Sequence, residues 1–131
     1  MKVELIGMAK PLVIVIDDDP SILRALRRLL SGAGFDVLTF DRPSTILKSE
    51  LPKAGACLVV DINLPEMNGI ELCESLAASG CRLPVILITA HTDVETQKQA
   101  DDAHPAALLI KPFGRELLVN SIEKALLADQ R

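Results

Sequence analysis

The chain has 131 residues, of which 49% are hydrophobic and 24% are charged, and its net charge is −4. A single domain of this size buries about two-thirds of its surface and needs no disulfide or structural metal, and the composition excludes an intrinsically disordered protein. The acidic balance and the presence of only three aromatic residues argue against a nucleic-acid-binding surface.

Strand and helix patterns alternate from the first apolar run onwards. The β-branched run at 12–16 predicts a strand buried on both faces. Pro20 suits the first turn of a helix, and Gly32 is expected to stop that helix. A short strand over 35–40 and a short helix over 43–51 are expected next. The apolar stripe of the first helix consists of Ile22, Leu23, Leu26, Leu29 and Leu30.

The second half of the chain repeats this alternation. A third strand over 57–61 is apolar up to its final aspartate, a fourth covers 85–89, and a fifth includes 108–110. Asp93 is expected to cap a helix over 94–103. The helix after the third strand has an apolar stripe of Ile70, Cys73, Leu76 and Ala77. The final helix has a stripe of Leu117, Leu118, Ile122, Ala125 and Leu126.

Five strand–helix units predict a doubly wound α/β domain with a five-stranded parallel sheet. Each crossover is long enough for the right-handed connection that parallel strands require. Residues 1–9 precede the first strand, so we expect an N-terminal extension there and a single domain over 10–131.

Two features bear on location. The apolar runs reach about five residues, whereas a membrane-spanning helix needs about twenty, and Glu4 and Gly7 interrupt any apolar signal core at the N-terminus. The three cysteines are an odd number without metal-type spacing, which fits reduced thiols that act as small apolar residues. We therefore expect a cytoplasmic protein that does not associate with membranes.

Polar side chains stand where the predicted strands end. Asp17 and Asp18 follow the first strand, Asp61 ends the third, Thr89 ends the fourth, and Lys111 follows the fifth. The carboxyl ends of parallel strands meet at one edge of an open α/β sheet, and ligands bind at that edge. If the first and third strands are neighbours, the three carboxylates converge there.

The charges at this edge favour a divalent cation. Three carboxylates and one ammonium group sum to −2, and two like charges about 5 Å apart repel by roughly 3 kcal/mol at an effective dielectric constant of 20. Oxygen donors without a nearby His or Cys favour Mg²⁺ over Zn²⁺. Taken singly, each residue has a structural explanation, such as an acid that caps a helix N-terminus. The combination over four strand ends favours a site for an oxyanion that shares Mg²⁺ with the protein.

Four segments carry a family resemblance. They are Val-Ile-Val-Ile-Asp-Asp-Asp at 13–19, Val-Val-Asp-Ile-Asn-Leu-Pro-Glu-Met-Asn-Gly at 59–69, Ile-Leu-Ile-Thr-Ala at 86–90 and Lys-Pro-Phe at 111–113. In this order and at these spacings, the pattern resembles the receiver domain of bacterial two-component response regulators over about residues 11–128. The resemblance implies a flavodoxin-like fold with strand order 2-1-3-4-5, and it would make 10–131 a receiver domain.

The resemblance also implies residue roles at a phosphorylation site. Asp61 would accept a phosphoryl group from the phosphohistidine of a histidine kinase or phosphotransfer protein. The carboxylates of Asp18 and Asp61 and the backbone carbonyl of Asn63 would bind Mg²⁺, and Asp17 would act mainly through metal-bound water. Phosphoryl transfer needs positioning and charge neutralisation more than acid–base chemistry, which fits this residue set.

The remaining two site residues, Thr89 and Lys111, would contact the phosphoryl oxygens. The domain would phosphorylate and slowly dephosphorylate itself, without turning over an outside substrate. It would pass the signal to a target protein or a linked output domain through the face formed by the fourth helix, fifth strand and fifth helix.

Two departures from the family pattern lie on that output face. Leu108 stands where the family usually has Tyr or Phe, and Ala-His-Pro at 103–105 stands where many receivers have Ala-Gly-Ala. They motivate an alternative function, a phosphorylation-independent interaction module, although the intact Asp/Thr/Lys set argues against it. A Mg²⁺-dependent phosphohydrolase of another α/β family is a third hypothesis, but the chain lacks that class's Asp-x-Asp nucleophile loop. Under the favoured hypothesis, the switching element is expected at 90–104.

Overall fold

The computed structural model describes residues 10–129. In this part of the chain five strands alternate with five helices, in the order β1 (Leu12–Ile16), α1 (Pro20–Gly32), β2 (Asp36–Phe40), α2 (Pro43–Leu47), β3 (Ala56–Asp61), α3 (Gly69–Ala78), β4 (Val85–Thr89), α4 (Val94–Asp102), β5 (Ala107–Ile110) and α5 (Arg115–Asp129). All neighbouring strands are parallel, in the order β2-β1-β3-β4-β5. The predicted flavodoxin-like fold is confirmed. The extension expected at 1–9 lies outside the described residues.

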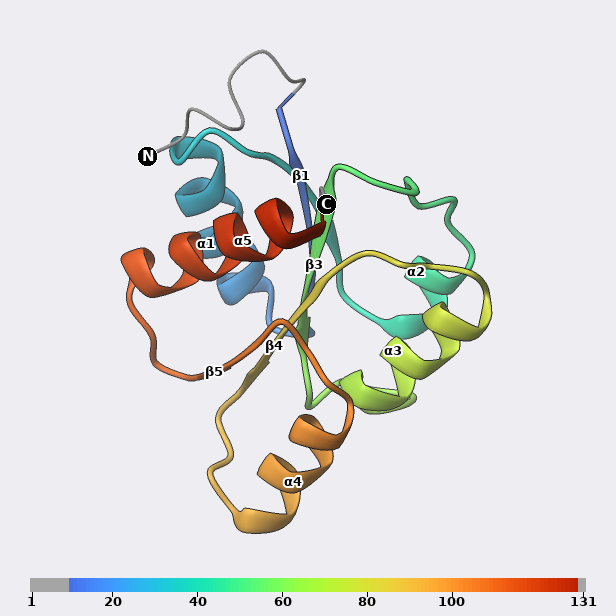
Figure 1. Cartoon of the computed structure of the whole chain (residues 1–131). Coiled ribbons are helices and arrows are strands. Elements are labelled where there is room, and N and C mark those ends of the chain that lie inside the picture. Colours follow the sequence, from blue (N-terminus) through green and yellow to red (C-terminus); the bar gives the residue numbers. More distant parts are fainter. Residues whose placement is uncertain (1–9, 130–131) are drawn as a thin grey trace.

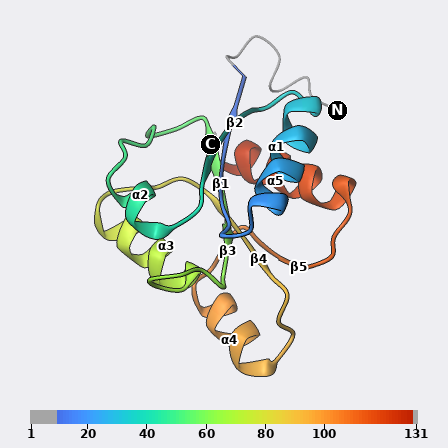
Figure 2. The same cartoon turned by 180° about the vertical axis from the view of Figure 1, so that it is seen from behind.

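The sheet lies between two layers of helices. α1 and α5 cover one face and α2 and α3 the other, while α4 protrudes at one edge of the sheet and packs on the α2–α3 side through Ala100 (Figures 1 and 2). Along β1, Val13 and Val15 pack into the α1–α5 layer, whereas Ile14 and Ile16 pack into the α2–α3 layer. Because alternate residues enter different layers, a central strand must be apolar on both sides, which explains the continuous apolar runs.

The register of the sheet brings separate strand ends to one level. Ile16 of β1 pairs with Val60 of β3. Asp17, the next residue after β1, therefore comes level with Asp61 at the end of β3. Lys111 directly follows β5 at the same edge of the sheet.

The apolar faces of two helices differ from the prediction. Leu117 is 53% exposed, and Val119 is buried in its place. In α3, Ala77 is exposed and Leu72 is fully buried. Neighbouring residues point about 100° apart around a helix, so the angle at which each helix settles on the sheet decides which flank of its stripe is covered.

Helix α2 is shorter than predicted, since it ends at Leu47 rather than at residue 51. Lys48 caps it, and the Ser49 N–H donates to the carbonyl of Ile46 in a tightened last turn. Pro52 disfavours a helical conformation at Leu51, and in a continued helix its ring would clash with the carbonyl of Lys48, so the helix cannot extend through 51.

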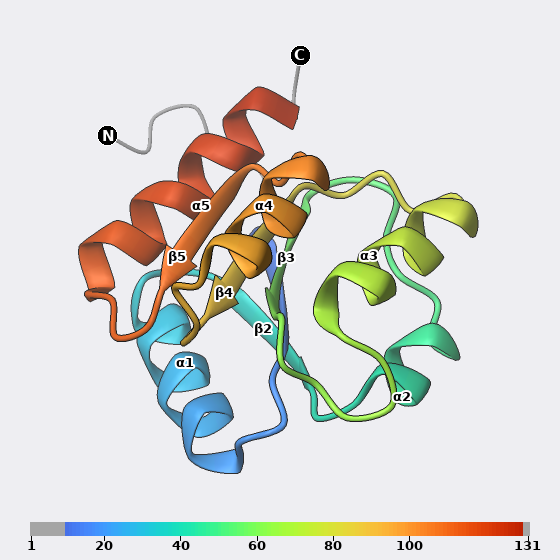
Figure 3. The same cartoon turned by 90° about the horizontal axis from the view of Figure 1, so that it is seen from below.

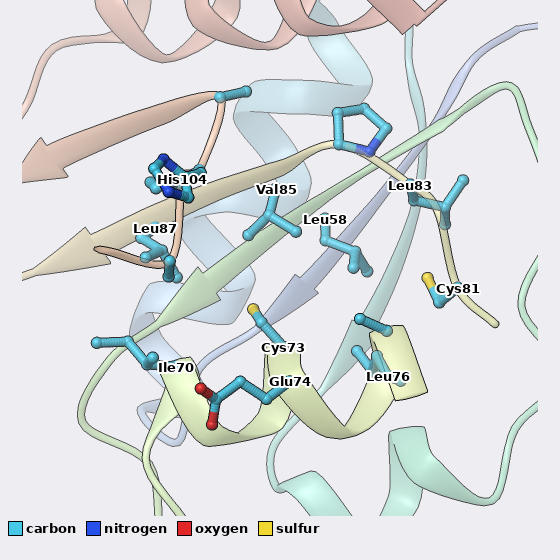
Figure 4. A pocket seen from close by; sticks show the side chains of 15 residues that line it. Leu58, Ile70, Cys73, Glu74, Leu76, Cys81, Leu83, Val85, Leu87 and His104 are labelled. Atoms are coloured by element: carbon cyan, nitrogen blue, oxygen red, sulfur yellow. The ribbon is translucent and has the colours of Figure 1, made fainter. Parts of the chain in front are cut away.

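Helix α4 packs sparsely. Asp93 accepts a hydrogen bond from the N–H of Thr96 and so caps the helix as predicted. Ala100 is the buried residue of α4, and Val94 is 84% exposed. An apolar pocket of about 420 Å³ lies between α3 and the connection from α4 to β5, lined by residues that include Cys73 and His104 (Figure 4). None of the predicted site residues lines it.

No helix within residues 10–129 has both the length and the apolar character that crossing a bilayer requires.

Candidate functional site

The ends of β1, β3 and β5 bring a lysine between two buried carboxylates. The Lys111 Nζ donates to Oδ2 of Asp17 at 3.0 Å and to Oδ2 of Asp61 at 3.3 Å. Asp17 is fully buried, Asp61 is 4% exposed, and Asp18 is exposed. Figure 3 looks from below, the side on which β3 gives way to α3 and α4 protrudes. The structure thus brings together four of the residues that the sequence singled out.

The second oxygen of each buried carboxylate is held by its own chain. Oδ1 of Asp17 accepts from the N–H of Asp19 at 2.9 Å, and Oδ1 of Asp61 accepts from the N–H of Asn63 at 3.1 Å. Aspartates commonly bond the backbone two residues on when a strand turns into a loop. Both side chains are therefore oriented by one backbone bond and one bond to Lys111. Asp19 itself caps α1 by accepting from the N–H of Ser21.

The protonation equilibria of Asp61 and Lys111 reflect this burial. Desolvation raises the pKa of Asp61 and the charge of Asp17 raises it further, while the Asn63 N–H and Lys111 act in the opposite direction. For Lys111, burial lowers the pKa, but the hydrogen bonds and charges of Asp17 and Asp61 outweigh it, so the pKa is raised. Lys111 therefore stays cationic. The ionised form of Asp61 is destabilised by its surroundings, and a further positive charge nearby would stabilise it.

The carboxylate cluster fits a magnesium ion. Asp17, Asp18 and Asp61 each offer an oxygen, and these three atoms lie within 4.8 Å of one another. The three carboxylates and Lys111 sum to −2, which a divalent cation neutralises. A donor set of oxygens alone, partly open to water through Asp18, suits Mg²⁺, because this ion keeps several of its water ligands. Asn63 lies on the loop immediately after Asp61, where its carbonyl is a further oxygen donor.

Thr89 ends the strand next to the one that carries Asp61, but its hydroxyl bonds away from the cluster. It is fully buried at the end of β4, and its Oγ1 accepts a hydrogen bond from the N–H of His91 at 3.0 Å. Among the described residues, no hydrogen bond joins this hydroxyl to Asp61 or Lys111. Thr89 shares the strand parity of Leu87, which packs in the α2–α3 layer.

Sequence reasoning missed how tightly the loop after Asp61 packs. A Cβ on Gly69 would collide with the backbone oxygen of Asp61 and would lie 2.9 Å from Cγ1 of Val60. The Gly69 N–H donates to the carbonyl of Ile62 at 2.8 Å. Glycine is thus required here for a close approach of two backbones. The helix start was readable from the spacing of Asn68 and Glu71, which form a reciprocal capping box at α3.

A second missed feature connects this loop to α2. Both oxygens of Glu66 accept hydrogen bonds from Ser44, one from its N–H and one from its hydroxyl. The two residues lie 22 positions apart, and no local pattern marks either of them.

Comparisons with known proteins agree with this architecture. The response regulator receiver domain family matches residues 13–123. Nodulation protein W of Bradyrhizobium diazoefficiens is 31% identical over 122 residues, which make up 93% of this chain and 54% of that protein. The C4-dicarboxylate transport transcriptional regulatory protein DctD of Pseudomonas aeruginosa is 37% identical over 118 residues, 90% of this chain and 26% of that protein.

Solved structures show the same likeness. The response regulator StyR is 43% identical with a TM-score of 0.84, covering 93% of this chain and 62% of that one. Full-length FixJ from B. japonicum is 33% identical with a TM-score of 0.85, covering 94% of this chain and 61% of that one. The chain spans about half or less of the length of the curated relatives it matches. By this family match and by its fold, the chain belongs to the response regulator receiver domains of two-component signalling.

Proposed function

We propose that Asp61 accepts a phosphoryl group from the phosphohistidine of a histidine kinase or phosphotransfer protein. A carboxylate oxygen of Asp61 attacks phosphorus, the phosphorus–nitrogen bond breaks, and its electron pair stays on the partner's imidazole. The observation that carries this proposal is the buried Asp61 carboxylate, oriented by Asn63 and Lys111 at the strand ends of a receiver-family chain. The reaction yields an aspartyl phosphate, which water hydrolyses slowly.

The neighbouring residues supply charge and position. Asp18, Asp61 and the carbonyl of Asn63 would hold Mg²⁺, with Asp17 acting mainly through metal-bound water. When bound, the ion neutralises negative charge on the transferring group. Lys111 lies between the buried carboxylates and would donate to a phosphoryl oxygen.

Thr89 would donate to another phosphoryl oxygen. Its hydroxyl oxygen already accepts from the N–H of His91, so the hydroxyl hydrogen remains for donation. The hydroxyl must turn toward Asp61 to reach the new group. This movement would couple phosphorylation to the segment 90–104 and to the face formed by α4, β5 and α5.

The wider setting belongs to the same proposal. The regulators that this chain matches are longer, so the downstream target is either a separate protein or an output domain linked to the receiver. A cytoplasmic location fits the three free cysteines, because reduced thiols persist in a reducing compartment.

The output face supports a second candidate function, a phosphorylation-independent interaction module. Leu108 replaces the usual aromatic residue, and His104 holds a positive φ of 52° between α4 and β5. Both residues lie in the region that would respond to phosphorylation, and neither belongs to the carboxylate cluster.

One experiment separates the two functions. The protein is incubated with Mg²⁺ and a small acyl phosphate, and its intact mass is measured, since the chain has no Trp or Tyr for a fluorescence readout. Phosphoryl transfer predicts the addition of one phosphoryl group that a chelator prevents, whereas an unchanged mass favours the phosphorylation-independent interaction module. Amide exchange in the presence of a phosphoryl mimic then tests switching. Slower exchange across 90–104 supports a conformational switch. Unchanged exchange across 90–104 favours a passive phosphate acceptor.

A further inference from the structure

The loop after Asp61 contains a strained turn. Glu66 has a φ of 71°, and the Met67 N–H donates across it to the carbonyl of Pro65 at 2.7 Å. Positive φ is uncommon for a residue with a side chain, and three-residue turns of this kind are rare and strained. Such a conformation persists only where surrounding contacts enforce it.

Ser44 provides those contacts from a distant segment. Its N–H donates to Oε1 of Glu66 at 2.8 Å, and its hydroxyl donates to Oε2 at 3.0 Å. Each carboxylate oxygen thus receives one charge-assisted hydrogen bond, a stronger contact than a neutral pair. Because Ser44 sits in the first turn of α2, the clamp ties the strained loop to a separate element of the α2–α3 layer.

The clamp lies between the two anchored ends of the loop. At one end the Asn63 N–H is bonded to the Asp61 carboxylate, and at the other the Gly69 N–H is bonded to the carbonyl of Ile62. Glu66 falls midway between these two residues, so the bonds from Ser44 restrain the middle of the loop that carries the Asn63 carbonyl.

We propose that the Glu66–Ser44 clamp holds the Asn63 carbonyl toward the carboxylate cluster and so sets the Mg²⁺ affinity of the site. Glu66 is then a positioning residue for phosphorylation, although it touches no reacting atom. This inference rests on the proposed function, because it assumes that the cluster binds Mg²⁺.

Two pairs of variants test the clamp. In Glu66→Asn the new side chain tolerates a left-handed backbone but is too short to reach Ser44. In Glu66→Gln the side chain keeps its length: its amide oxygen can accept from the Ser44 N–H, and its NH₂ group can donate to the Ser44 hydroxyl. Ser44→Ala removes one bond without a change of charge, and Ser44→Thr retains the hydroxyl. Calorimetric titration with Mg²⁺ is expected to show about tenfold weaker binding for Glu66→Asn, a smaller loss for Ser44→Ala, and near-native binding for Glu66→Gln and Ser44→Thr.

Amide exchange of the metal-free protein supplies a second readout. The amides of Asn63, Met67 and Gly69 should exchange faster in Glu66→Asn and Ser44→Ala than in the wild type. If Mg²⁺ affinity and loop exchange were unchanged while only the melting temperature fell, Glu66 would merely cap α2 and the inference would be wrong. A wild-type protein that failed to bind Mg²⁺ would instead overturn the proposed function. Amide exchange in the metal-free variants would still show whether the clamp restrains the loop.

Discussion

The carboxylate cluster and helix α4 lie at the same edge of the sheet, yet they are held in opposite ways. Asp17 and Asp61 are buried and each has a bond to the backbone and a bond to Lys111. In α4, by contrast, Ala100 is the buried residue and the rest of the helix is intermediate or exposed. Few buried contacts mean low local stability, so this edge combines an ordered chemical site with a weakly held neighbour.

The two ends of α4 add to this difference. Asp93 caps the first turn well, and its pKa is lowered by hydrogen bonds from Thr96. The last turn carries Asp101 and Asp102 and no basic residue, and acids are unfavourable at the negative end of a helix dipole. His104 then adopts a positive φ that glycine would adopt without strain. A weakly held α4 is suited to changing conformation when the adjacent site changes charge.

The largest expected effect is on chemistry at the cluster. Asp61→Asn should abolish phosphoryl incorporation from a small acyl phosphate, because an amide does not attack phosphorus as a carboxylate does. Intact mass spectrometry measures this directly. Asp19→Asn is the matched control, since it also sits at the strand end but only caps α1, and asparagine caps a helix equally well. Undiminished phosphorylation of Asp61→Asn would remove Asp61 from its proposed role.

The next effect concerns the packing under Asp61. Gly69→Ala places a methyl group against the Asp61 backbone and should lower the free energy of unfolding by about 1–3 kcal/mol. Gly32→Ala is the control, because a Cβ there meets nothing within 4 Å, and it should be neutral or slightly stabilising. Chemical denaturation of both variants measures the contrast. Equal stabilities would mean that the loop moves aside freely and that the site is not held more firmly than α4.

Mg²⁺ should stabilise the folded protein, because an ion that binds only the folded state shifts the folding equilibrium toward that state. At a free concentration ten times its dissociation constant, the gain in free energy of unfolding is about 1.4 kcal/mol, measured as a rise in melting temperature.

Asp18→Ala should weaken Mg²⁺ binding more than Asp17→Ala. It should also slightly raise the melting temperature of the metal-free protein, because it removes one like charge. Asp17→Ala should lower that melting temperature, since Lys111 and the Asp19 N–H lose an acceptor. The reverse order of Mg²⁺ affinities in calorimetry would refute the proposed ligand roles.

The pH dependence of stability should show the cost of ionising Asp61. Its folded-state pKa is raised above the ordinary value of 3.8 by burial and by Asp17. The stability it contributes is therefore complete below that ordinary value and is lost as the pH rises through the folded-state pKa. In a chelating buffer, the melting temperature of Asp61→Asn should exceed that of the wild type by a margin that widens over this interval and then levels off. A margin that narrowed with rising pH would contradict the assigned direction.

The smallest effect is expected beside α4. His104→Gly relieves the positive φ at the expense of a larger loss of backbone entropy on folding, so the net stabilisation should be about 0.5–1 kcal/mol, with slower amide exchange in α4. His104→Ala removes the same imidazole but keeps a Cβ, so it should give no such gain. A stabilisation shared by both variants would trace the effect to the imidazole rather than to the backbone.

Much of the fold and most of the cluster followed from local patterns. The strands at 12–16 and 85–89 were predicted with the bounds observed, because continuous β-branched runs between breakers have few alternatives. Asp17 and Asp61 converge because they lie at the ends of the neighbouring parallel strands β1 and β3, and the long side chain of Lys111 reaches them from the end of β5, two strands from β3. The position of the Thr89 hydroxyl did not follow, since a buried side chain at a strand end takes the partner that its surroundings offer, here the His91 N–H.

The sequence by itself determined the order of elements, the edge that carries the charges and the residue types gathered there. These depend on hydrophobic periodicity and on strand direction, which are local properties of the chain. The tertiary structure alone decided that Glu66 bonds Ser44, that Gly69 has no room for a Cβ, and that Val119 rather than Leu117 is buried. Each of these depends on how segments that are distant in the chain meet after packing, and no periodicity within one segment encodes the separation or angle at which they meet.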